Sequence, residues 1–162
     1  MIETAVGEPR QETFTRADLR TLEQLMAQFE PEVPLEWQLD VGDVNSGWHD
    51  LEHVGRIPEL VHRLGDGDWL VLQTKGDEEN LRYAQLMGNG EHFHVEVAVN
   101  KPDGVHNFRI GYGGDSIAEG NEPGTSPGDN QWLTREDAID VVSAWARGGR
   151  FLSGYGACLH MY

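Results

Sequence analysis

The stretch from Leu81 to Asn100, LRYAQLMGNGEHFHVEVAVN, constrains the fold of this chain most strongly. Its central Gly88-Asn89-Gly90 favours the positive φ angles of a tight reversal, and apolar residues flank it on both sides, which predicts a β-hairpin. Successive side chains of a strand point to opposite faces, so the second strand has one apolar and one polar face. The apolar face carries Phe93, Val95, Val97 and Val99, and the polar face carries His92, His94, Glu96 and Ala98.

A hairpin of this kind needs neighbouring strands and a layer that covers its apolar face. Strands are predicted as a buried segment at 69–74 and at about 107–112, where Phe108, Ile110 and Tyr112 alternate with other residues; a shorter strand is predicted at 35–40. Four of these strands follow one another in sequence, which favours an antiparallel meander. The expected fold class is α+β, with an antiparallel meander sheet of about four to six strands and helices packed on one face.

Three helices are predicted from capping and periodicity. Thr15 to Asp18 resembles a capping box, and apolar residues then repeat at helical spacing over 19–29. A second helix is expected to begin at Pro58 and to end at Gly65. Thr134 is the expected N-cap of a third helix, which ends near Gly148. The tail at 151–162 is apolar enough to dock as an edge strand or an extended segment.

The 162 residues fit one domain, with residues 1–13 expected to be a loose leader. The longest aliphatic and aromatic run, Trp69–Leu72, is far shorter than the roughly 20 residues of a membrane span, so no membrane association is expected. The start of the chain has no basic and apolar signal pattern, which favours a cytoplasmic location. Cys158 is the single cysteine and has apolar neighbours, which fits a reducing compartment and argues against a catalytic thiol.

The chain is strongly acidic, with 28 Asp and Glu against 12 Lys and Arg and a net charge of −16. Direct binding to nucleic acid is not expected, because phosphate contacts depend on Lys and Arg. Solubility alone can explain this charge. The alternative is a basic protein partner, which such a field would attract quickly.

The polar face of the hairpin also offers a possible metal site. His92, His94 and Glu96 share that face, and a His-x-His pair is a ligand arrangement found in β proteins. The spacing differs from the cupin pattern, so a solvated or partner-facing strand is the competing interpretation. His49 and His53 are four residues apart and would share a face only on a helix. No phosphate-binding loop is recognisable, and no cofactor is expected.

A segment rich in glycine, proline and acids, at 113–130, is the favoured binding element, because long segments of this kind between regular elements are often functional. Its carboxylates could stand in for phosphates and block a basic cleft. Aromatic residues near predicted loops are candidate anchors, although each could equally belong to the core. The candidate partner-binding residues are Trp48, Tyr112, Asp115, Glu119, Glu122, Asp129 and Trp132.

Several segments between Val54 and Arg150 resemble the deaminase-associated immunity family of bacterial polymorphic toxin systems. They are VGRIPELVHRLGDGDWLVLQ, YAQLMGNGEHFHVEVAV, EPGTSPGDNQWLT and REDAIDVVSAWARGGR. The resemblance implies a small cytoplasmic α+β protein that binds and neutralises a cognate secreted toxin, often a nucleic-acid deaminase with a basic surface. A metal-dependent enzyme that uses His92, His94 and Glu96 is the alternative, and a general regulatory interaction module is a third reading.

Overall fold

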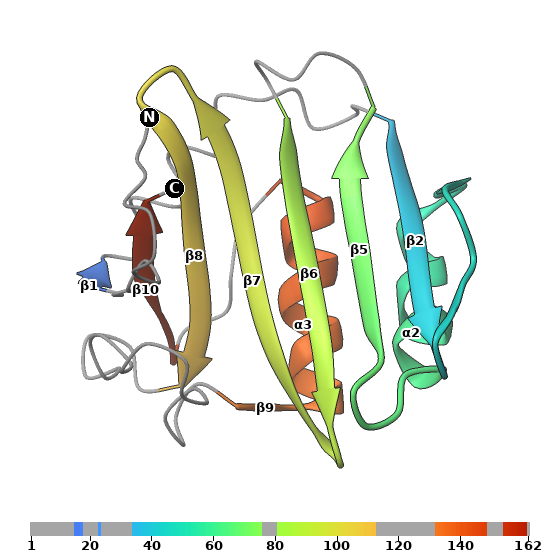
Figure 1. Ribbon diagram of the computed structural model, residues 1–162. Helices are drawn as coiled ribbons and strands as arrows, with labels where there is room; N and C mark the ends of the chain where they lie inside the picture. Colours follow the sequence, from blue (N-terminus) through green and yellow to red (C-terminus); the bar gives the residue numbers. More distant parts are fainter. Residues whose placement is uncertain are drawn as a thin grey trace, which may run out of the picture.

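The structure is a computed structural model that describes residues 15–17, 23, 34–75, 81–112, 132–148 and 154–161. In this part of the chain the strands form one ten-stranded antiparallel sheet, in the order β1-β10-β8-β7-β6-β5-β2-β3, with β4 paired to β2 and β9 paired to β7 (Figure 1). The long strands are β2 (Leu35–Val41), β5 (Trp69–Thr74), β6 (Arg82–Asn89), β7 (His92–Lys101), β8 (Gly104–Tyr112) and β10 (Tyr155–Met161). The short strands are β1 (Thr15–Ala17), β3 (Val44–Asn45), β4 (His49–Asp50) and β9 (Leu133–Thr134).

The predicted α+β class and the predicted meander are confirmed, because β5, β6, β7 and β8 pair in sequence order. The sequence predicts a buried β5, but its residues alternate between buried and half-buried positions, so only one of its faces lies in the core. The sheet is also wider than the meander, since β2 extends it beyond β5 and β10 extends it beyond β8.

Two predictions for the ends of the chain are corrected. Thr15 does not cap a helix: Thr15–Ala17 forms β1 and pairs with Ala157–Leu159 of β10. The tail is not an edge strand, because β10 lies between β8 and β1. The helix predicted at 19–29 falls outside the described residues except for Glu23, which is helical, and the leader at 1–13 also lies outside them.

The turn of the central hairpin differs from the prediction in one detail. Of Gly88, Asn89 and Gly90, only Gly90 has a positive φ, of 66°. Gly88 lies within β6, where a Cβ atom would come within 2.4 Å of the Gly65 carbonyl oxygen. The Gly88 N–H donates to the Asp68 carbonyl, and its own carbonyl accepts from the Gly67 N–H. Gly88 is therefore needed for the close approach of the turn at 65–68.

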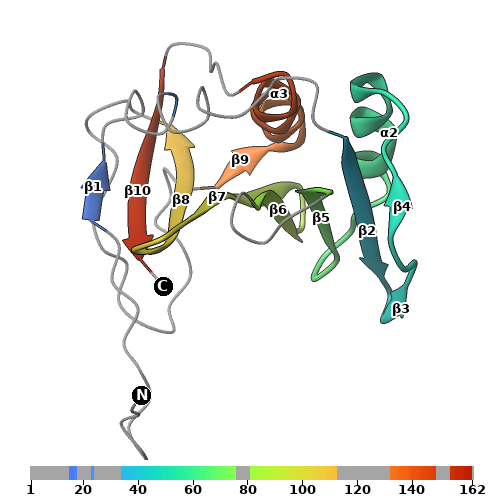
Figure 2. The same ribbon diagram turned by 90° about the horizontal axis from the view of Figure 1, so that it is seen from above.

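Both helices that the structure describes in full, α2 (Ile57–His62) and α3 (Arg135–Ala146), lie on the same face of the sheet (Figures 1 and 2). A short 3-10 turn, η1 (Val54–Arg56), leads directly into α2, whose first turn contains Pro58 as predicted, although the helix ends before Gly65. The Thr134 hydroxyl accepts a hydrogen bond from the Asp137 N–H at 3.2 Å, which confirms the predicted N-cap of α3.

The core lies between these helices and the sheet. Its buried side chains include Leu39, Ile57, Leu60, Leu70, Leu72, Leu86, Phe93, Val97, Phe108, Val142 and Trp145. Arg135 at the start of α3 joins the two helices, because its guanidinium donates to the Val61 carbonyl at 2.6 Å and to the Leu64 carbonyl at 3.1 Å. Among the described residues, no helix has the length and the hydropathy needed to cross a membrane.

Candidate functional site

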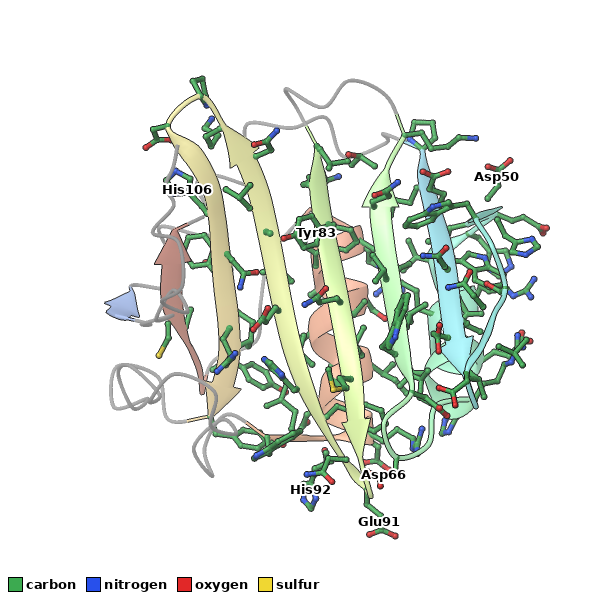
Figure 3. All side chains as sticks on the ribbon, viewed as in Figure 1. Asp50, Asp66, Tyr83, Glu91, His92 and His106 are labelled. Atoms are coloured by element: carbon green, nitrogen blue, oxygen red, sulfur yellow. The ribbon has the colours of Figure 1, made fainter. Side chains whose placement is uncertain are left out.

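The sheet face opposite α2 and α3 carries the candidate site, and it is called the open face here. Figure 3 views the molecule from this side, with Tyr83 near the middle of the sheet. In β5 and β6, strand alternation separates this face from the core, because the side chains on the helix side are buried and those on the open face are half-buried or exposed. The central strands contribute Glu36, Gln38, Asp40, Trp69, Val71, Gln73, Tyr83, Gln85, Met87, His94, Glu96, Ala98, Asn107 and Arg109.

A buried ionic cluster lies at the centre of the open face, where Gln85, Glu96 and Arg109 are cross-strand neighbours. Glu96 is 5% exposed and Arg109 8%. The Arg109 guanidinium donates to Glu96 Oε2 from Nη2 at 2.8 Å and from Nε at 3.1 Å. Glu96 Oε1 accepts from Asn107 Nδ2 at 2.9 Å and from Gln85 Nε2 at 3.2 Å.

His94 completes the cluster, with its Nε2 atom 2.8 Å from Glu96 Oε2. Burial on its own would raise the pKa of the Glu96 carboxyl, but the hydrogen bond and charge of His94, the charge of Arg109 and the Asn107 amide outweigh burial and lower that pKa to about 2. Glu96 is therefore ionised at neutral pH. Since an ionised carboxylate only accepts hydrogen bonds, His94 Nε2 carries the proton in this contact.

A hollow of about 260 Å³ lies beside the cluster on the open face and is called the sheet hollow. Trp69, Met87 and His94 are neighbours across β5, β6 and β7, and they form one side of it. Val71, Gln85, Leu86 and Glu96 complete the lining. Met87 is 47% exposed and lies beside the half-buried Trp69 and Val71, so together they form an apolar patch. The hollow therefore presents apolar surface next to an ionic floor, in which both carboxylate oxygens of Glu96 accept hydrogen bonds.

A second hollow, of about 420 Å³, lies at the hairpin end of the sheet and is called the turn hollow. It is lined by Asn89, His92, Tyr112, Trp132 and Thr134. Tyr112 and Trp132 border the segment 113–131 on its two sides, so the structure brings together two of the three predicted aromatic anchors. The two hollows adjoin, because the His94 ring of the sheet hollow meets the Trp132 ring edge-on at 6.0 Å.

Tyr112 also has a structural task within the protein. Its hydroxyl donates to Asp137 Oδ2 at 2.5 Å and accepts from the Thr134 N–H at 3.0 Å. Burial and the Asp137 carboxylate raise the pKa of the Tyr112 hydroxyl. Its ring stacks on Tyr155 at 6.0 Å. Tyr112 therefore fixes the end of β8 to the start of α3, and only its ring is offered to the turn hollow.

Of the remaining predicted partner-binding residues, the structure describes only Trp48, which does not line either hollow. Trp48 is 42% exposed, but it lies between β3 and β4, which both pair with β2, while the turn hollow is built on β6–β9. The four predicted carboxylates, Asp115, Glu119, Glu122 and Asp129, lie outside the described residues.

The histidines do not assemble into a metal site in the described part of the chain, where no three His, Cys, Asp or Glu side chains are placed to hold one ion. His92 is exposed at the turn hollow, whereas His94 is engaged with Glu96 (Figure 3). His49 lies in β4 and stacks on Trp37 at 4.6 Å, and His53 precedes η1, so the two share no helix. Cys158 is buried, in agreement with its apolar neighbours.

Trp69, Val71, Met87 and Arg109 are among the site residues that sequence reasoning missed. The first two lie in a run whose apolar composition indicates a buried strand. A useful signal was present, because Trp69, Val71 and Gln73 alternate with Leu70 and Leu72 and so mark a second face.

Comparison with known proteins does not assign this chain to a family. A scan against protein-family models, a search of curated proteins and a search of solved structures found no significant match. The resemblance to the deaminase-associated immunity family therefore stays a prediction from the sequence.

Proposed function

We propose that this chain is an immunity protein, which binds and neutralises a cognate bacterial toxin that acts on nucleic acid, with a deaminase as the expected toxin class. The observation that carries this proposal is the pair of adjoining hollows with Trp69, Met87, Tyr112 and Trp132 in their walls, on a protein of net charge −16. Aromatic and methionine side chains inside a polar surround are typical of the centres of protein interfaces.

The charge of the protein supports a basic partner. A toxin that acts on nucleic acid needs a cationic surface for phosphates. A deaminase also needs an open pocket that receives the flipped or single-stranded base. Acidic groups border the hollows, since Asp66 and Glu91 lie at the hairpin end of the sheet beside His92 (Figure 3). Carboxylates there can pair with toxin residues that otherwise bind phosphate, and the bound protein would cover the substrate cleft.

The ionic cluster also fits a binding surface better than a proton-transfer site. A general acid or base works best with a pKa near the operating pH. The Glu96 carboxyl has a pKa of about 2 and accepts hydrogen bonds from four neighbouring side chains. Such a group holds its charge and its position. We therefore propose a non-enzymatic role, exercised in the cytoplasm of the producing cell.

Purification of the tagged chain from its native host, followed by mass spectrometry, would identify its partner. The catalytic domain of that partner is then purified and assayed on single-stranded and double-stranded DNA and on RNA, with rising amounts of the chain. The proposal predicts stoichiometric inhibition and a dissociation constant in the nanomolar range. It is overturned if the partner does not act on nucleic acid, or if its activity is unchanged when the chain is in excess.

A further inference from the structure

We infer that the open face of the sheet is the main contact with the toxin, and that the sheet hollow receives one apolar or aromatic side chain from a basic toxin surface. This inference rests on the proposed function. It moves the main contact away from the acidic segment at 113–130, which the sequence favours, and places it on the central strands β5, β6 and β7.

The size and chemistry of the sheet hollow identify what it can hold. Its volume of about 260 Å³ lies below the roughly 300–1,000 Å³ of pockets that bind drug-sized ligands, so it fits a single large side chain. Trp69, Val71 and Met87 offer apolar contacts. The Glu96 carboxylate in its wall is already engaged, because Gln85 Nε2 donates to its Oε1 atom and His94 Nε2 contacts its Oε2 atom. An apolar side chain can enter without breaking these hydrogen bonds, whereas an anionic one would meet the charge of the Glu96 carboxylate.

The charges of the open face indicate that basic residues of the toxin surround the side chain that enters the hollow. Arg109 pairs with Glu96 inside the cluster, so these two charges cancel. Glu36 and Asp40 of β2 then leave the part of the open face on β2 and β5–β8 with a net negative charge. Glu36 accepts from Gln73 Nε2 at 2.6 Å, which holds its carboxylate in place. A complementary surface therefore presents Lys or Arg around its central apolar side chain.

The sheet hollow is also preformed in the unbound protein. Its walls stand on three hydrogen-bonded strands, and the Glu96 cluster ties β6, β7 and β8 together from side chain to side chain. A rigid surface loses little conformational entropy on association, so more of the contact energy contributes to affinity. A partner side chain in the hollow is thus expected to act as a binding hot spot.

The test compares Met87→Lys with Val44→Lys in binding to the purified toxin domain. Both sites are exposed strand positions, and both substitutions change an apolar side chain to the same cation, so the net charge of the protein changes equally. Val44 lies on the edge strand β3, and β2 separates β3 from the strands β5, β6 and β7 that carry the sheet hollow. We expect Met87→Lys to weaken binding by at least about 30-fold, and Val44→Lys by less than about threefold. Matching circular dichroism and melting temperature check the fold, and Met87→Ser replaces Met87→Lys if the latter does not fold.

A third variant separates this inference from the proposed function. It replaces the four carboxylates of the acidic segment by amides, at Asp115, Glu119, Glu122 and Asp129. If this variant loses binding while Met87→Lys binds like the wild type, the inference is overturned and the immunity role stands. If the wild type does not inhibit the toxin, the proposed function itself fails. Sedimentation velocity tests whether a second copy of the chain fills the hollow instead. A wild-type dimer that Met87→Lys dissociates would assign the hollow to that second copy and overturn the inference.

Discussion

The Glu96–Arg109 pair allows the sharpest test of how the open face is built. The side chains are 7% and 9% exposed, and their ionic contact measures 2.8 Å. Removal of one partner of such a pair leaves a buried charge without compensation, which typically costs about 3–5 kcal/mol. The lowered pKa of Glu96 agrees in scale, because a fall from 4.5 to about 2 corresponds to about 3 kcal/mol of stabilisation shared among its partners. We expect Arg109→Met and Glu96→Gln each to reduce the free energy of unfolding by about 3 kcal/mol.

The double variant Glu96→Gln/Arg109→Met removes both charges together. The amide oxygen that this variant carries at position 96 can still accept from Asn107, so the remaining loss is that of neutral hydrogen bonds, at about 1–2 kcal/mol. We therefore expect the double variant to be no less stable than either single variant, with a coupling energy of at least about 2 kcal/mol. Urea unfolding followed by circular dichroism and by tryptophan fluorescence measures all four proteins.

Two results would refute this reasoning. Single substitutions that cost less than about 1 kcal/mol would mean that the pair behaves like an exposed salt bridge in contact with water. A double variant whose loss equals the sum of the two single losses would mean that the two side chains stabilise the fold independently.

Two further predictions concern the same region. Because the folded-state pKa of Glu96 is depressed from 4.5 to about 2, its contribution to stability is complete above pH 4.5 and is lost as the pH falls towards 2; acid unfolding of wild type and Glu96→Gln should therefore converge, and parallel curves would contradict the assigned pKa. Gly88→Ala should reduce the free energy of unfolding by about 1–3 kcal/mol, because its Cβ would meet the Gly65 carbonyl oxygen, whereas Asn89→Ala at the neighbouring exposed position should change it by less than about 0.5 kcal/mol in the same urea assay.

Local sequence patterns correctly predicted the elements that are stabilised by contacts between residues close together in the chain. The Thr134 cap, the central hairpin and the meander from β5 to β8 depend on contacts between residues close in the chain. Thr15–Ala17 shows the limit of such patterns. Its residues match a capping box, but their backbone groups pair with Ala157–Leu159 at the opposite end of the chain. A long-range strand pairing therefore replaced the cap predicted at Thr15, and a motif of four residues does not contain that information.

The candidate site was predictable only in part, for a related reason. Tyr112 and Trp132 flank one segment, so they meet once β8 and β9 are both placed near β7. Trp48 belongs to a different edge of the sheet. Trp69 is missed because a continuous apolar run conceals which of its residues face the helices. The distinction between the two faces depends on α2 and α3, which cover only one of them.

The polar strand His92-x-His94-x-Glu96 shows how this sheet combines charge with a binding surface. A solvated row of such residues would be mobile, and a metal site would bind a cation. The structure instead pairs Glu96 with Arg109 and His94, which removes the charge from the middle of the face and fixes the side chains around the sheet hollow. Net negative charge remains at the β2 side and at the hairpin end. Acidic groups there would mainly speed association and make it sensitive to salt, while the apolar hollow would mainly determine how slowly the complex dissociates. Salt should therefore change the association rate of the proposed toxin complex far more than its dissociation rate.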